Sequence, residues 1–198
     1  MSDSEMDLLD PDAALMVAFQ NGSEEAFALL LDKYQRPIVN FLYRIVNDRS
    51  EGEDLAQEVF LRVYRARAKY EPRGRFAPWI YRIATNVGLK AARRKRRTQL
   101  WSVSSKEFEP QAAAVCESAA SAEQQLVQAE LTRVVRRSIE RLPVKERIAI
   151  VLRRYEELSY REIADVMNCT EAAVKTYIHR GKLHLRDRIL SYVRGGKI

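Results

Sequence analysis

The sequence of 198 residues has little of what marks fibrous, turn-rich or membrane proteins. Its 7 glycines and 6 prolines are too few for a collagen-like chain or an all-β chain with many tight turns. Its apolar runs, such as 26–31 and 148–152, are far shorter than the roughly 18 residues that a membrane span needs. The acidic N-terminus also lacks the basic start of a signal peptide. We therefore expect a soluble cytoplasmic protein without membrane insertion.

Cysteine and histidine are scarce as well. Cys116 and Cys169 lie 53 positions apart, form no CxxC pair and have no histidine pair nearby. A structural role is favoured for both, and two thiols without a disulfide pattern fit a reducing cytoplasm. His179 and His184 are five residues apart, which places them on different faces of a helix. The sequence therefore predicts no metal site and no cofactor.

Charge divides the chain clearly. The net charge is +7, but residues 1–26 carry −7, 27–97 carry +10, 98–129 carry −3 and 130–198 carry +7. Two basic blocks separated by an acidic one predict two modules that bind a polyanion, with nucleic acid as the leading partner. Charge alone leaves open the alternative that lysine and arginine only solvate helix faces.

Helical periodicity runs through the first basic block, where apolar residues recur at steps of three and four. A kink or break is expected at Pro37, and residues 70–75 are expected to form a loop. Six bases within 90–97 suit nucleic-acid phosphates, and nearby aromatic rings suit unstacked bases. A solvated helix end and, for Trp79, a place in the core are the alternatives. The helices are expected over 24–46, 49–70 and 76–97.

The second basic block opens with two apolar helices, one over 131–142 and one from Val144 onwards. A short helix over 160–167 follows. Ser159 and Glu162 have the spacing of a capping box, in which each residue satisfies an unpaired backbone N–H at the start of a helix. This spacing fixes the beginning of the short helix.

A tight turn and a longer helix follow the short one. Asn168 suits a left-handed turn, and Thr170 suits the cap of a final helix over 171–193. That helix carries apolar residues on one face and basic residues on the other. A short helix, a turn and a longer helix with a basic face indicate a helix-turn-helix whose second helix enters the major groove of DNA.

The expected fold is therefore all-α, with two small helical domains joined by a flexible linker and a helix-turn-helix in the C-terminal one. The linker is rich in serine and alanine and lacks a sustained apolar period. The expected parts are an acidic leader over 1–24, a helical domain over 25–97, the linker over 98–129 and the helix-turn-helix domain over 130–194.

Three segments together resemble a known family. They are EDLAQEVFLRVYRA (53–66), FAPWIYRIATNVGLKAARRKRR (76–97) and LPVKERIAIVLRRYEELSYREIADVMNCTEAAVKTYIHRGKLHLR (142–186). In this order they resemble the small extracytoplasmic function (ECF) group of bacterial RNA polymerase sigma factors. The resemblance implies a factor that binds core RNA polymerase, directs it to specific promoters and helps melt them, with no catalysis of its own. The implied partners are core polymerase, promoter DNA as duplex and as melted single strand, and an anti-sigma factor.

The same resemblance implies roles for three groups of residues. The group expected to dock on the clamp of the largest polymerase subunit is Glu53, Asp54, Gln57, Glu58 and Leu61. The group expected to read and melt the downstream promoter element is Tyr70, Arg73, Arg75, Trp79, Tyr81, Arg82, Asn86, Lys90, Arg93 and Arg94. The group expected to bind the upstream element is Ala172, Ala173, Lys175, Thr176, His179, Arg180 and Lys182.

The sequence also departs from the family pattern. Many relatives open the recognition helix with Gly-Thr and follow the next valine with arginine, whereas this chain has Ala172, Ala173 and Lys175. Lysine lacks the planar fork that arginine offers to guanine, so we expect a different upstream sequence preference. Residues 1–24 match no part of the family pattern.

Two other classes of function remain as alternatives. A stand-alone helix-turn-helix regulator would bind a specific duplex without polymerase, although the N-terminal half lacks the alternating strands and helices of a receiver domain. An enzyme acting on nucleic acid would need a metal-binding carboxylate pair or a phosphate-binding glycine loop, and the sequence offers neither. The acidic residues around 53–58 are better explained as a docking face.

Overall fold

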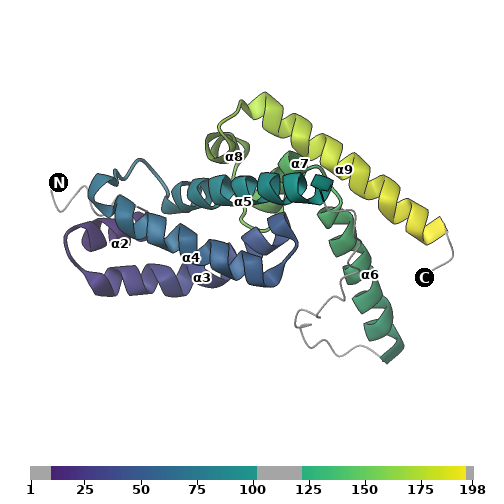
Figure 1. Ribbon diagram of the computed structural model, residues 1–198, viewed down its shortest axis with the longest axis horizontal. Coiled ribbons are helices and arrows are strands. Elements are labelled where there is room, and N and C mark those ends of the chain that lie inside the picture. Colours follow the sequence, from purple (N-terminus) through teal and green to yellow (C-terminus); the bar gives the residue numbers. More distant parts are fainter. Residues whose placement is uncertain (1–9, 102–121, 195–198) are drawn as a thin grey trace.

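The structure is a computed structural model that describes residues 10–101 and 122–194, and these residues contain no strand (Figure 1). The expected all-α fold is confirmed. The helices are α2 (Pro11–Gln20), α3 (Glu24–Val46), α4 (Arg49–Ala66), the 3₁₀ turn η1 (Arg67–Lys69), α5 (Phe76–Trp101), α6 (Ala122–Glu140), α7 (Val144–Arg154), α8 (Tyr160–Met167) and α9 (Glu171–Arg194).

The first module is a bundle of α2, α3, α4 and α5. The amphipathic spacing of α3 puts Leu30, Ile38, Phe41 and Leu42 at no more than 1% exposure, at the centre of the bundle. A kink or a break was expected at Pro37; α3 continues through this residue, so the chain does not break there. The four apolar side chains give α4 and α5 a common surface on which to pack.

Helix α2 corrects the sequence-based division, which assigned its residues to an acidic leader over 1–24. Met16 and Phe19 are buried in the bundle. The carboxylate of Asp10 caps the start of α2 and accepts a 3.0 Å hydrogen bond from the backbone N–H of Phe76, at the start of α5. The Asp-Pro dipeptide at this point is an N-terminal helix signature that the charge pattern concealed.

The helix-turn-helix forms as the sequence predicts. Ser159 accepts from the backbone N–H of Glu162 at 3.2 Å, and the Glu162 carboxylate accepts from the Ser159 N–H at 2.7 Å, which completes the capping box. Asn168 adopts the left-handed conformation with φ of 50°. Thr170 accepts from the backbone N–H of Ala173 and caps α9. Local capping chemistry therefore fixes where α8 begins and ends and where α9 begins.

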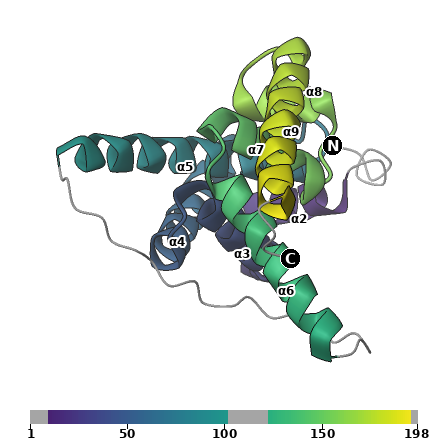
Figure 2. The ribbon, with the colours of Figure 1, turned by 90° about the vertical axis from the view of Figure 1, so that its right-hand side faces the viewer.

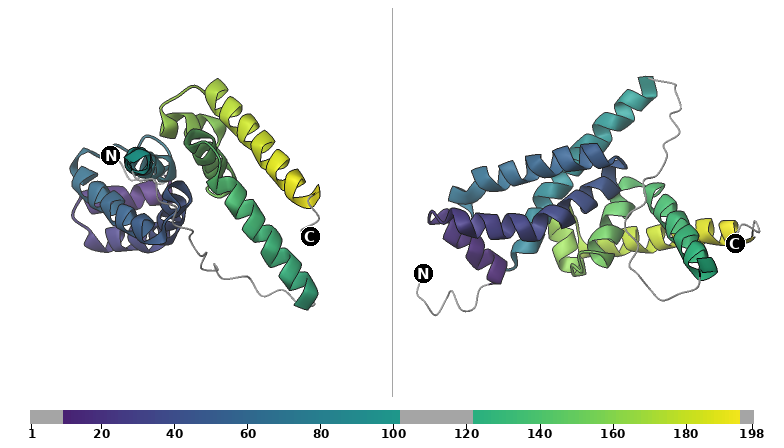
Figure 3. Two further views of the ribbon diagram at one scale, coloured as in Figure 1. Left: turned by 45° about the vertical axis from the view of Figure 1, so that its right-hand side comes forward. Right: turned by 90° about the horizontal axis from the view of Figure 1, so that it is seen from below.

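The two modules pack against each other. Helix α5 packs against α3 and α4 of its own module and against α8 of the second, while the second module also meets α3 through α7 (Figures 2 and 3). Buried apolar residues of both modules form one continuous cluster. Both ends of the predicted linker are helical, because α5 continues to Trp101 and α6 begins at Ala122. The rest of the linker, 102–121, lies outside the described residues together with Cys116.

Candidate polymerase and promoter interfaces

Helix α4 presents the residues predicted to dock on polymerase. Its apolar stripe, including Val59 and Val63, faces the bundle, so the opposite face points to solvent. Glu53, Asp54 and Gln57 are exposed, Glu58 is half-buried and Leu61 is 54% exposed. Glu53 pairs with Arg49 at 3.1 Å, and Glu58 accepts from Arg62 on the next turn. These pairs lie within one helix, so they leave the acidic face open to a partner.

The loop before α5 is held by aromatic packing. Tyr70 is buried and its ring meets the edge of Trp79 at 5.0 Å between centroids, while Trp79 itself is half-buried. Burial, with a smaller contribution from Asp10, raises the pKa of Tyr70 to about 12. The predicted site residues Arg73 and Arg75 are exposed; Arg73 pairs with Glu71, and Arg75 lies 3.1 Å from a carboxylate oxygen of Glu162 on α8.

One face of α5 carries an exposed polar row. Arg82, Asn86, Lys90 and Arg93 follow each other at steps of four, four and three, which places them within one arc of the helix. Arg94 is exposed but lies on the α4 side, where it pairs with Glu51 at 3.1 Å. The row has the positive charge and hydrogen-bonding groups that a nucleic-acid strand requires.

Tyr81 differs from the other predicted residues of α5. It is 2% exposed, and its hydroxyl donates a hydrogen bond to Glu156 in the segment between α7 and α8. Burial raises the pKa of Tyr81 above its usual range, and the Glu156 carboxylate adds to the effect. Tyr81 therefore faces the second module in this arrangement and not solvent.

Helix α9, the predicted recognition helix, carries its buried and its exposed residues on different faces. Val174 and Ile178 are buried, whereas Ala173 is half-buried and the other predicted residues are exposed. Thr176 donates its hydroxyl to the backbone carbonyl of Ala172 at 2.9 Å. The exposed predicted residues are Ala172, Lys175, Thr176, His179, Arg180 and Lys182.

Sequence reasoning missed the contacts that hold α9 in place. Nδ1 of His184 lies 2.8 Å from a carboxylate oxygen of the buried Glu146 on α7. A Cβ atom at Gly181 would lie 2.4 Å from Cδ1 of Ile150, so α7 and α9 cross closely there. A glycine within a helix is the local signal for this close contact in the sequence.

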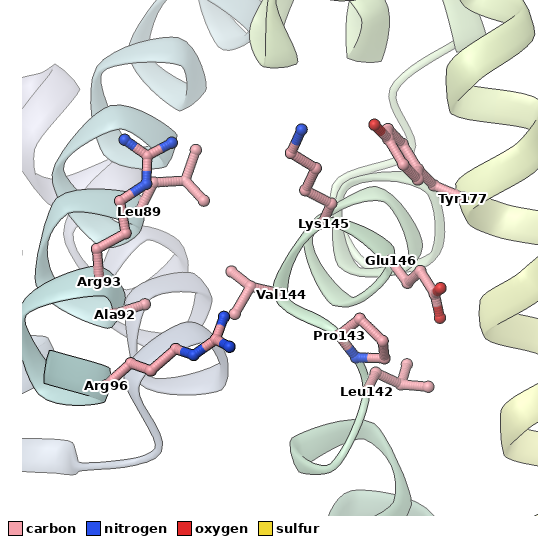
Figure 4. Close-up of a pocket in the computed structure, with 10 residues that line it drawn as sticks. All are labelled: Leu89, Ala92, Arg93, Arg96, Leu142, Pro143, Val144, Lys145, Glu146 and Tyr177. Atoms are coloured by element: carbon pink, nitrogen blue, oxygen red, sulfur yellow. The ribbon is translucent and has the colours of Figure 1, made fainter. Parts of the chain in front are cut away.

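A groove of about 500 Å³ lies between α5 and the start of α7. Leu89 and Ala92 line it on one side and Val144 on the other (Figure 4). Arg93 and Arg96 extend from α5 (Figure 4). Lys145 and Tyr177 complete its second wall, from α7 and α9. The groove thus combines an apolar lining with basic edges.

Other kinds of site are not seen in the part of the chain that the structure describes. Within residues 10–101 and 122–194, no three His, Cys, Asp or Glu side chains are placed to hold a metal ion. No helix in those same ranges is long and apolar enough to cross a membrane.

Comparison with known families defines the class of this chain. Residues 30–98 match the family model of sigma-70 region 2, and residues 132–185 match that of sigma-70 region 4. The two modules, in this order, define a sigma-70-type factor. The first match covers α4 and most of α3 and α5, and the second covers α7, α8 and the first part of α9.

Full-length relatives narrow the class. The chain is 33% identical to the ECF RNA polymerase sigma factor SigW of Bacillus subtilis over 172 residues, which is 86% of this chain and 92% of the relative. It is 30% identical to the ECF RNA polymerase sigma-E factor of Escherichia coli K12 over 187 residues, or 92% and 96% of the two chains. The chain belongs to the ECF sigma factors of bacterial RNA polymerase. It is therefore a transcription initiation factor that directs core polymerase to promoter DNA.

Solved structures share the fold. CnrH in complex with the cytosolic domain of CnrY matches with a TM-score of 0.67 at 19% identity, over 92% of this chain and 99% of that one. The sigma factor RpoE in complex with the anti-sigma factor NepR from Bartonella quintana matches with a TM-score of 0.63 at 18% identity, over 82% and 96%. The family models and the full-length relatives confirm the family resemblance drawn from the sequence, and the stand-alone regulator is not favoured. The roles of individual residues stay predictions.

Proposed function

We propose that the two modules divide a promoter between them, with residues 25–97 acting on the downstream element and residues 130–194 on the upstream one. The observation that carries this proposal is the pair of exposed basic helix faces, on α5 and α9, each backed by a buried apolar face. Two such faces on one chain suit two separate stretches of the same DNA.

Helix α5 would act on the melted strand. The cations of its polar row, Arg82, Lys90 and Arg93, would neutralise phosphates, while Asn86 offers an amide to a base edge. Arg73 and Arg75 on the loop would help select a base that has left the stack. Tyr70 and Trp79 would support the loop from beneath, since their rings pack together.

Helix α4 would dock on core polymerase. Glu53, Asp54 and Gln57 form an exposed polar face, and Leu61 adds an exposed apolar side chain one to two turns further on. Acidic side chains around an apolar anchor suit a basic helical partner, because charge speeds and orients the encounter and the anchor supplies burial. The polymerase clamp is the partner proposed for this face.

Helix α9 would read the upstream duplex. Lys175 and His179 lie on the exposed face near the start of the helix, where side chains of helix-turn-helix proteins meet base edges. Arg180 and Lys182 flank them and suit phosphates. The hydroxyl of Thr176 donates its hydrogen to the backbone of its own helix, so Thr176 would offer DNA its methyl group and its oxygen lone pairs.

An anti-sigma factor is the proposed regulator. CnrH is bound to the cytosolic domain of CnrY, and the Bartonella quintana RpoE to the anti-sigma factor NepR. The groove between α5 and α7 suits an acidic amphipathic segment of such a partner, because Arg93, Arg96 and Lys145 surround apolar side chains. The chain would act in the cytoplasm with polymerase and carry out no catalysis itself.

Run-off transcription with core RNA polymerase on a pool of genomic promoter fragments tests the proposal. A defined set of start sites should arise only when the protein is added. Arg82→Ala should weaken initiation at every such promoter, whereas Lys175→Ala should alter which promoters are used. If the protein yields no transcripts but selects a duplex motif on its own, the proposed division of labour is wrong.

A further inference from the structure

Helix α2 is attached to both ends of the loop that precedes α5. It lies at the same end of the first module as that loop, and it contacts both η1 and α5 (Figure 1). Asp10, just before the first turn of α2, and Gln20, its last residue, each make one hydrogen bond to the backbone at an end of the loop. Because residues 70–75 are proposed to select a base, these attachments bear on promoter recognition.

The first attachment lies at the end of the loop, where α5 begins. Oδ2 of Asp10 accepts the backbone N–H of Ala13 at 3.2 Å, as the cap of α2, and also the backbone N–H of Phe76 at 3.0 Å. The N–H of Phe76 belongs to the first turn of α5, whose N–H groups lack acceptors within their own helix. One carboxylate oxygen therefore caps two helices, and its charge is placed favourably for both helix dipoles.

The second attachment lies at the beginning of the loop. Nε2 of Gln20 donates to the backbone carbonyl of Tyr70 at 3.2 Å, and Tyr70 is the residue at which η1 ends. Phe19, next to Gln20, adds a contact with η1, because the guanidinium of Arg67 lies 5.2 Å from the centre of its ring. The beginning of the loop is thus held at the end of α2 by a hydrogen bond and by packing.

Helix α2 is itself firmly seated in the bundle. Met16 and Phe19 are at most 1% exposed. The buried carboxylate of Asp12 accepts from the hydroxyl of Tyr34 at 2.6 Å and pairs with Lys33 at 2.6 Å, and both of these partners belong to α3. Residues attached to α2 are therefore held relative to the core of the module.

Between its two attachments the loop is open to solvent. Glu71, Arg73, Gly74 and Arg75 are exposed, and Gly74 has a positive φ of 95°. The N–H of Arg73 donates to the carbonyl of Glu71 at 2.9 Å, which is a bond within the loop. An exposed segment with few buried contacts has low local stability, so its shape depends on how its ends are held.

We propose that Asp10 and Gln20 are positioning residues for the downstream promoter element, which hold the 70–75 loop in the shape that selects a base. This proposal rests on the function proposed for Arg73 and Arg75. Asp10 and Gln20 act through the loop and not by contact with DNA. They raise the fraction of molecules in which the loop already has its binding shape, and this fraction scales the apparent affinity for the preferred base.

The test measures base preference by run-off transcription with core polymerase, on promoters with a fixed upstream element and a randomised downstream element. Asp10→Ala and Gln20→Ala should each lower the discrimination between the preferred base and the others about fivefold, because each variant loses one hydrogen bond to the loop. Asp10→Asn should retain the discrimination, since asparagine keeps an acceptor oxygen and is an equally good N-cap. A merely structural loss would lower transcription from all promoters of the pool alike.

Ser23→Ala is the matched control for stability. The hydroxyl of Ser23 caps α3 by accepting the backbone N–H of Ala26 at 3.2 Å, and this bond lies within one turn of the chain. The variant should lower the midpoint of thermal unfolding as Asp10→Ala does, but it should leave base preference unchanged. Unaltered preference in Asp10→Ala and Gln20→Ala, or an equal loss of preference in Ser23→Ala, would overturn the positioning role.

Fluorescence separates this proposal from the proposed function. In a Trp101→Phe background Trp79 is the only tryptophan, and its ring packs on Tyr70 and Phe76, at the two ends of the loop. Acrylamide should quench Trp79 more strongly in Asp10→Ala and Gln20→Ala than in Ser23→Ala, and equal quenching would overturn the positioning role. If the unaltered chain has no downstream base preference, the proposed function fails instead, and quenching alone decides whether α2 holds the loop.

Discussion

Helix α8 makes two contacts that differ in how they are held together. Against α9 it uses Ile163, Ala164 and Val166, which are buried together with Val174, and both helices of this pair are capped by side chains of their own turn. Towards α5 its chief polar link is the ion pair of Glu162 with Arg75, at 3.1 Å. Apolar residues pack in both contacts, because the buried cluster is continuous across the modules. The contact with α9 is capped locally, whereas the contact with α5 adds an exposed ion pair across a long sequence separation, which suits a more reversible contact.

The largest effect is expected where a buried apolar side chain is removed from the contact between α8 and α9. Ile163→Ala should lower the free energy of unfolding of the second module by about 2–5 kcal/mol, because a fully buried side chain leaves a cavity. Chemical denaturation followed by circular dichroism measures the change. Arg161→Ala, an exposed change on the same helix, should stay within about 0.5 kcal/mol. A similar loss in both variants would show that α8 is not anchored through its apolar face.

The buried arginine between the modules should have the next largest effect. Arg147→Met keeps much of the volume but removes the hydrogen bonds to the Arg44 and Ile45 carbonyls, so the coupling of the modules should weaken by about 1–3 kcal/mol. The single unfolding transition expected of the coupled modules should then split in two. Arg154→Met, exposed on the same helix, provides the control. A single unchanged transition in Arg147→Met would contradict the role of this residue in coupling.

The cap of α9 ranks third. Thr170→Ala removes the acceptor for the Ala173 backbone N–H and should destabilise the helix-turn-helix by about 1 kcal/mol. Thr170→Asn should retain most of the stability, because asparagine is an equally good N-cap. Thermal unfolding of the two variants separates them. Equal midpoints would mean that the cap contributes little beyond the packing of Val174.

Local chemistry in the sequence predicted the second module well. The capping box of Ser159 and Glu162, the left-handed Asn168 and the cap by Thr170 all appear where their residue types and spacing required. Such features depend on atoms three or four residues apart, which a sequence exposes directly. Residues 10–20 were misassigned because charge was given more weight than the Asp-Pro signature and the apolar side chains after it.

The contacts between the modules could not be predicted in the same way. Arg147 and the carbonyls of α3 are about a hundred residues apart, and an arginine on a helix of a basic module resembles any solvated cation. Tyr81 showed the same difficulty, since its place among candidate DNA-binding residues gave no sign that Glu156 would cover it. Periodicity identifies the outer face of a helix but not the element that packs against it.

The smallest effect is expected for the ion pair between Arg75 and Glu162. Its size measures how reversible the contact of α8 with α5 is. A double-mutant cycle with Arg75→Gln and Glu162→Gln should give a coupling energy of about 0.2–1 kcal/mol, because solvent screens a pair in which Arg75 is 55% exposed. Scattering at rising salt measures the fraction of molecules in which the two modules have separated. This fraction gives the free energy of the contact between the modules for each variant. Added salt should separate the two modules of the unaltered chain and have less effect on either variant, because the Debye length falls to about 3 Å at 1 M salt. A coupling that is several-fold larger, or insensitive to salt, would make this contact as permanent as the one between α8 and α9.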